Sequence, residues 1–120
     1  MANFDVIVIS ETWLINVNFC TNLFHNYSFV FHEPTASHVG GLGIFIHNKF
    51  SFKVLDNLKI PTTLNNCVEN IWVQLTIPDS DFIVILGGVY RHPSQHVNDF
   101  WNQIEPSLSH IADGNFNEWL

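Results

Sequence analysis

Glu11 is the residue that the sequence places best to do chemistry. It follows the apolar run Val6–Ile9 and lies between two hydroxyl residues, Ser10 and Thr12. A run that is apolar on both faces predicts an interior strand covered on each side, and open α/β sheets bind ligands beyond the carboxyl ends of such strands. The sequence therefore predicts a carboxylate delivered to a site at a strand end. The alternative is that Glu11 begins a loop and caps a local turn, as acidic residues commonly do.

A second group of polar residues follows another apolar run, Phe82–Val89, which the same argument predicts to be a central strand. Tyr90 comes at its end. His92 and His96 have the i,i+4 spacing of a helical zinc pair, but Pro93 separates them. We therefore expect the histidines to be ordinary exposed or half-buried side chains.

A glycine-rich segment, Gly40–Gly43, leads into the apolar segment Ile44–Asn48. It lacks the Lys-Ser/Thr of a phosphate-binding loop and enters a strand where such loops enter a helix. The favoured interpretation is that these glycines allow close backbone packing at the start of a strand.

The composition predicts one folded domain or part of one, because 47% of the 120 residues are hydrophobic, including eleven Phe and four Trp. The net charge of -7 argues against tight binding of DNA or RNA without help, but does not exclude a metal-assisted site.

Cys20 and Cys67 lie in apolar surroundings, which favours buried thiols in a reducing compartment, the nucleus or the cytoplasm. No apolar run approaches the roughly 20 residues of a membrane helix, so we expect no membrane association.

The remaining elements follow from periodicity. Alternating or apolar runs predict strands over 27–32, 44–48, 70–77 and 82–90, the last two joined by a tight polar turn. Residues 50–55 are expected to pair back onto 44–48 as a hairpin, and residues 13–26 to form a packed loop.

A helix is predicted after the last strand. Apolar residues recur at three- and four-residue steps between Val97 and Ile111, with Ser94 as the expected N-cap and a kink at Pro106.

Five blocks of this sequence resemble one protein family in their order and rough spacing: Asp5–Leu14, Gly40–Ile46, Glu69–Val73, Gly88–Ser94 and Gly114–Asn117. The chain resembles the endonuclease/exonuclease/phosphatase family, and within it the apurinic-type endonuclease domains of non-LTR (LINE-like) retrotransposons. The resemblance covers nearly all of this chain but only about the N-terminal half of a complete domain. It implies that residues 1–120 are a single incomplete domain, lacking the first strand and the C-terminal half.

The implied fold is α/β (α+β), a partial four-layer α/β sandwich. It would consist mainly of the first mixed β-sheet, with one amphipathic helix near residues 95–111. Half of such a sandwich would leave one apolar sheet face uncovered. Because exposed faces of that kind are association surfaces, we expect self-association or a partner that covers the face.

The resemblance also implies roles for individual residues. Glu11 matches the family's metal-binding glutamate and would hold Mg²⁺ together with phosphate oxygens. Tyr90 matches a catalytic tyrosine that contacts the phosphate, and Arg91 follows it as a phosphate-binding residue. In the family's Gly-Asp-Phe-Asn block, Asn117 matches, whereas Asn115 replaces the Asp that deprotonates the attacking water.

That replacement bears on activity. An amide cannot accept a proton near neutral pH, and loss of a positioned general base typically costs on the order of 10²- to 10⁴-fold in rate. Asp113 lies two residues away on a turn, too far displaced in direction to restore the geometry. The family's general acid/base histidine has no counterpart.

The sequence thus predicts a fragment of a Mg²⁺-dependent DNA endonuclease, of the type that nicks retrotransposon target sites, which is inactive as this chain. DNA would be its partner, bound weakly. Two alternatives stay open: an active short phosphodiesterase, and a non-catalytic protein-interaction module that uses the uncovered sheet face.

Overall fold

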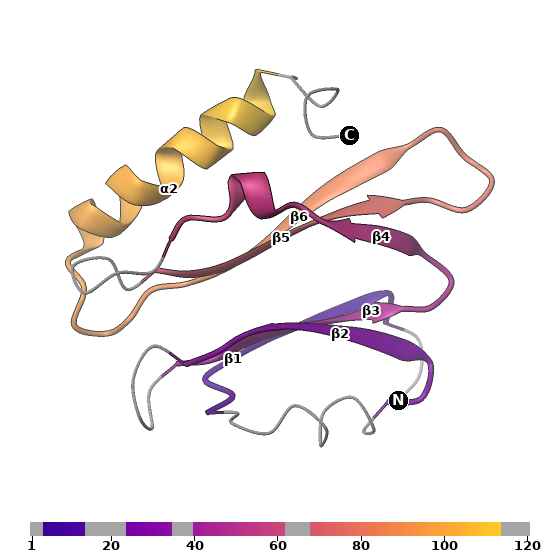
Figure 1. The fold of residues 1–120 in the computed structure, drawn as a ribbon, viewed down its shortest axis with the longest axis horizontal. Coiled ribbons are helices and arrows are strands. Elements are labelled where there is room, and N and C mark those ends of the chain that lie inside the picture. Colours follow the sequence, from indigo (N-terminus) through magenta and orange to yellow (C-terminus); the bar gives the residue numbers. More distant parts are fainter. Residues whose placement is uncertain (1–3, 14–23, 35–39, 62–67, 114–120) are drawn as a thin grey trace.

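The fold is α+β: two three-stranded antiparallel sheets and a helix (Figure 1). The computed structural model describes residues 4–13, 24–34, 40–61 and 68–113. The second sheet lies between the first sheet and the helix, so that the described residues form three layers.

The first sheet has the strand order β1-β3-β2, with β1 at Val6–Ser10, β2 at Tyr27–His32 and β3 at Leu42–His47. In register, Val8 of β1 and Val30 of β2 both lie opposite Ile44. The central strand is therefore shielded along both edges, and its residues from Leu42 to Ile46 are buried.

The second sheet has the order β4-β5-β6, with β4 at Ser51–Val54, β5 at Glu69–Thr76 and β6 at Ile83–Tyr90. A 3-10 turn, η1 at Asp56–Leu58, follows β4, and helix α2 at Val97–Ala112 follows β6.

The main core lies between the two sheets, where alternate residues of the central strands β3 and β5 meet. It consists of Leu42, Ile44, Ile46, Ile71, Val73 and Leu75. The inner faces of the two sheets thus cover each other, and the uncovered inner face that we expected from the sequence does not arise between these strands.

A smaller core lies on the outer face of the second sheet, where Trp72 packs with Leu55 and Leu58. Helix α2 lies over this face (Figure 1), where its Ile111 packs against this smaller core; Ile104 is the buried residue of the helix. The Ser107 hydroxyl donates a hydrogen bond to the Leu58 carbonyl (3.1 Å), which ties one flank of the helix to η1.

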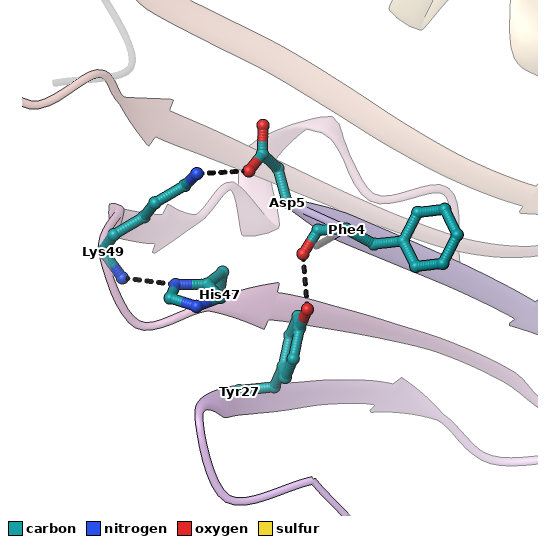
Figure 2. Close-up of polar contacts among 5 residues, drawn as sticks. All are labelled: Phe4, Asp5, Tyr27, His47 and Lys49. Atoms are coloured by element: carbon teal, nitrogen blue, oxygen red, sulfur yellow. Dashed lines mark hydrogen bonds and ion pairs between the residues drawn. The ribbon is translucent and has the colours of Figure 1, made fainter. Parts of the chain in front are cut away.

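Polar contacts fix the N-terminal end of β1 against the turn between β3 and β4 (Figure 2). The Tyr27 hydroxyl donates to the Phe4 carbonyl, and Lys49 forms an ion pair with Asp5. The backbone amide of Lys49 also donates to Nδ1 of His47 (3.0 Å). These contacts anchor one end of β1 and thereby set where its other end delivers Glu11.

Several predictions from the sequence are confirmed. The strands expected over 27–32 and 44–48 correspond to β2 and β3, and the expected antiparallel hairpin is β5–β6. Helix α2 follows as expected, with Pro106 inside it. Most of the loop expected over 13–26 lies outside the described residues.

Other predictions were wrong. The sheets are antiparallel, and both are built to the same extent, where we expected mainly one mixed sheet. The two apolar runs predicted to be interior strands, β1 and β6, lie at sheet edges, and Val8 in the middle of β1 is 47% exposed. Apolar residues on both faces of a strand indicate that other elements cover those faces. They do not indicate whether a further strand pairs with its edge.

Two local predictions also fail. Strand β4 pairs with β5, not with β3, because the turn at 48–50 carries the chain from one sheet to the other. The N-cap of α2 is His96, whose Nδ1 accepts from the Asn98 amide (3.1 Å). Ser94 instead bonds the His92 ring (2.7 Å).

Candidate functional site around Glu11 and Tyr90

The structure brings together the two residues that the sequence singled out most strongly. The Tyr90 hydroxyl donates a hydrogen bond to Oε1 of Glu11, although 79 residues separate them in the chain. Glu11 follows β1 in the first sheet, and Tyr90 is the last residue of β6 in the second. The stacking of the two sheets therefore places these two strand ends at one site.

Two further donors hold the Glu11 carboxylate. Its Oε2 accepts from the Trp13 indole Nε1 (2.6 Å) and from the Gly40 backbone amide (3.1 Å). These three donors come from three segments and fix the direction of the carboxylate, as a side chain that is to bind a metal ion requires.

The backbone around Glu11 is in an unusual conformation. Glu11 and Trp13 both have φ of 54°, in the left-handed region that residues other than glycine rarely adopt. The backbone amide of Thr12 donates to the Gly41 carbonyl (3.2 Å) and that of Trp13 to the Gly40 carbonyl (3.1 Å), which holds this conformation in place. Residues held in sparsely populated backbone regions cluster at functional sites.

Gly40 and Gly41 connect Glu11 to a second glutamate. The Gly41 amide donates to Oε1 of Glu69 (2.7 Å), so that two consecutive amides each hold a different carboxylate. Both glycines have positive φ, 90° and 94°. A Cβ at Gly40 would collide with the Glu69 carboxylate, and one at Gly41 with the Thr12 hydroxyl. The glycines thus allow the close packing expected from the sequence, and also bind side chains.

Sequence reasoning missed Glu69 as part of this site. It is 0% exposed at the start of β5, directly opposite Tyr90 in the ladder. The available signal was an acidic residue followed by Asn70 at the head of an otherwise apolar strand. Charged side chains are almost never fully buried unless they are paired, so that position pointed to a specific partner.

The carboxylate chemistry of the site suits the Mg²⁺ that the resemblance implies. Mg²⁺ is commonly held by one or two protein carboxylates together with substrate phosphates and waters. Glu11 is an exposed, directionally fixed carboxylate, and would be the ligand. In the described part of the chain, no group of three or more His, Cys, Asp or Glu residues could hold a metal on its own.

Of the other predicted site residues, Arg91 is the one that the structure describes. The Arg91 guanidinium donates to the Gln95 carbonyl (2.7 Å) and stabilises the turn that leads into α2. Its phosphate-binding role stays a prediction. Asn115 and Asn117 lie outside the described residues.

The comparisons with known proteins identify no relative: no protein-family model, curated protein or solved structure matches the chain. Over the described residues, no helix has the length and apolar character needed to cross a bilayer.

Proposed function

We propose that this chain is part of a Mg²⁺-dependent DNA endonuclease of the endonuclease/exonuclease/phosphatase type, which keeps the metal- and phosphate-binding side of the site but does not hydrolyse DNA efficiently. The observation that supports this most directly is the hydrogen bond from Tyr90 to Glu11. These are the two residues to which the family resemblance assigns phosphate and metal binding, and nothing in their sequence separation requires them to meet.

The roles follow from the geometry of the two side chains. Mg²⁺, when bound, would polarise the scissile phosphodiester. Glu11 would supply the carboxylate ligand, oriented by Trp13 and Gly40. The Tyr90 hydroxyl, which already donates toward the metal-binding carboxylate, would turn its hydrogen bond to a phosphate oxygen when substrate arrives.

Slow hydrolysis follows from Asn115, the residue in place of the family's general base. Without an acceptor for the proton of the attacking water, binding and polarisation of the phosphate do not lead to rapid cleavage. The proposed state is therefore a DNA-binding site of weak or absent activity.

The test combines nicking of supercoiled plasmid with Mg²⁺ binding. The purified chain is compared with Glu11→Ala and with the exposed helix control Glu105→Ala. We expect no Mg²⁺-dependent nicking above the level of Glu11→Ala. Nicking that is lost only in Glu11→Ala would show that the chain is an active phosphodiesterase and would overturn the inactive assignment.

Tryptophan fluorescence reports metal binding separately, because the Trp13 indole donates directly to Glu11. Mg²⁺ should change the emission of the wild-type chain and of Trp101→Phe, but not of Glu11→Gln or Trp13→Phe. The absence of any Glu11-dependent change would contradict the metal site itself.

A non-catalytic protein-interaction module is the second candidate. It is favoured by apolar side chains that α2 leaves about half exposed: Val97, Trp101 and Leu108. A chain that shows no Glu11-dependent Mg²⁺ signal but associates through these residues would fit this candidate better than the first.

A further inference from the structure

In the part of the chain that the structure describes, strand β6 has an unprotected free edge. It lies last in the order β4-β5-β6 and pairs with β5 along all eight of its residues. Among the described strands none pairs with its other side. Edge strands are normally protected by short length, Lys or Pro. The opposite edge, β4, has four residues and contains Lys53, whereas Ile83–Tyr90 contains no charged residue and no proline.

The backbone groups that β6 presents along this edge can be identified. The Ile77 amide donates to the Phe82 carbonyl, which makes these two residues a hydrogen-bonded pair. Because such pairs alternate along an antiparallel ladder, every second amide of β6 points away from β5. These outward amides belong to Ile83, Ile85, Gly87 and Val89.

Helix α2 extends an apolar stripe toward the same edge. The hydrogen bond from Ser107 to Leu58 holds one flank of the helix over η1, on the β4 side of the sheet. At 3.6 residues per turn, Val97, Trp101 and Leu108 share one stripe that lies roughly 100° around the helix from Ser107. Their side chains are 47%, 54% and 44% exposed. This stripe therefore lies on the flank of the helix that faces away from η1, toward the β6 side.

We propose that the β6 edge surface, defined as the free edge of Ile83–Tyr90 together with Val97, Trp101 and Leu108, binds the same surface of a second copy of this chain. The two β6 strands would pair antiparallel across a two-fold axis, which joins the two sheets into one continuous sheet of six strands. The helix stripes would then pack over the new junction.

The charged residues that flank β6 favour a second copy as the occupant. A chain with a net charge of -7 repels itself over most of its surface, but the paired strands would bring no charges of their own together. Acidic residues precede β6 at Asp79 and Asp81, and Arg91 follows it. In the antiparallel register that joins outward-facing residues, Ile83 and Ile85 of one copy lie opposite Val89 and Gly87 of the other. This register places Asp81 of one copy opposite Arg91 of the other, twice per dimer. A strand pair and three side chains per copy form a small interface, near the lower size limit of specific interfaces, about 1,000 Å² in total, so we expect a reversible dimer.

Association is measured by sedimentation equilibrium over a wide range of protein concentration. We expect a reversible monomer–dimer equilibrium that Ile83→Lys and Trp101→Glu each weaken at least tenfold. Both substitutions replace exposed side chains, so the variant monomers should stay folded, which circular dichroism checks. The matched control is Val8→Lys, which places the same charge at an exposed position of β1, an edge strand of the other sheet, and should leave the dimer unchanged.

Amide hydrogen exchange locates the interface without any substitution. On raising the concentration, the outward amides of Ile83, Ile85, Gly87 and Val89 should become protected, while their neighbours bonded to β5 change little. A chain that stays monomeric at all concentrations would overturn the proposal. So would a dimer that is lost in Val8→Lys but kept in Ile83→Lys. Neither outcome bears on the Mg²⁺ site, because the proposal does not depend on it.

Discussion

Asn70 stabilises the fold through an unusually complete set of hydrogen bonds for one side chain. It is 0% exposed. Its Oδ1 accepts from the Ile60 amide (2.8 Å) and from the Trp72 indole (2.9 Å), and its Nδ2 donates to the carbonyls of Ile60 (2.9 Å) and Val68 (3.2 Å). This amide thus satisfies both donors and both acceptor positions, and it attaches the segment after η1 to the head of β5.

We predict that Asn70→Ala lowers the free energy of unfolding by about 2–4 kcal/mol, since it leaves several buried polar groups without a partner. Asn70→Asp should also destabilise the fold, because a carboxylate accepts but cannot donate to the two carbonyls. Urea unfolding followed by circular dichroism measures both. The control Asn102→Ala, at an exposed position of α2, should stay within about 0.5 kcal/mol of wild type. Equal effects of Asn70→Ala and Asn102→Ala would contradict this role.

At the scale of residues, the sequence singled out Glu11 and Tyr90, which a hydrogen bond joins, but not their buried neighbours. Glu11 and Tyr90 stand out because each is a polar residue that ends an apolar run. Glu69 and Asn70 act through partners that come from distant segments, Gly41 and Ile60. Spacing along one strand contains no information on such partners. The roles of Glu69 and Asn70 can therefore be recognised only when the fold has brought these segments together.

At the scale of elements, aromatic rings packed over glycines hold both sheets in register. Gly87 of β6 lies opposite Trp72 of β5, and a Cβ at this glycine would collide with the Trp72 ring. A Cβ at Gly43 in β3 would likewise collide with the ring of Phe29 in β2, although the residue opposite Gly43 in the ladder is Phe31. Each ring thus lies directly over a glycine, in space that a side chain at that glycine would need.

We therefore expect Gly87→Ala to displace Trp72 and to cost about 1–3 kcal/mol, the usual penalty for overpacking. The displacement should shift Trp72 emission to longer wavelength as the ring leaves the core, and a lower urea midpoint would report the stability loss. Thr76→Ala, at the exposed end of β5, provides the control. A Gly87→Ala protein of wild-type stability would show that the ring has room to move.

The elements themselves were easier to predict than their arrangement. The β5–β6 hairpin and α2 follow from local signals: a tight polar turn between two runs, and a three- and four-residue period. The partners of β1, β4 and β6 depend on where the chain crosses between sheets. The local sequence of the turn at 48–50 is typical of a hairpin turn, and the sequence therefore predicts the wrong neighbour for β4.

At the scale of the whole molecule, charge limits what the proposed site can bind. The chain has eleven acidic residues and four basic ones. Of the basic side chains, Lys49 pairs with Asp5 (2.5 Å), and Arg91 donates to Gln95. Affinity for duplex DNA comes largely from the neutralisation of phosphates by Lys and Arg. The protein surface therefore contributes little electrostatic affinity for DNA.

We predict that the chain binds duplex DNA more weakly than about 1 µM near physiological salt without divalent cations, the tight limit of ordinary non-specific binding. Mg²⁺ should strengthen binding in the wild-type chain but not in Glu11→Ala, because Glu11 would hold the ion and the ion would supply positive charge for the phosphates. Fluorescence anisotropy of a labelled duplex that is not cleaved measures the affinity with and without Mg²⁺. The salt dependence should be shallow, since few phosphates are neutralised by side chains. Tight binding without Mg²⁺, with a steep salt dependence, would contradict this prediction and would mean that Glu11 is not where DNA meets this protein.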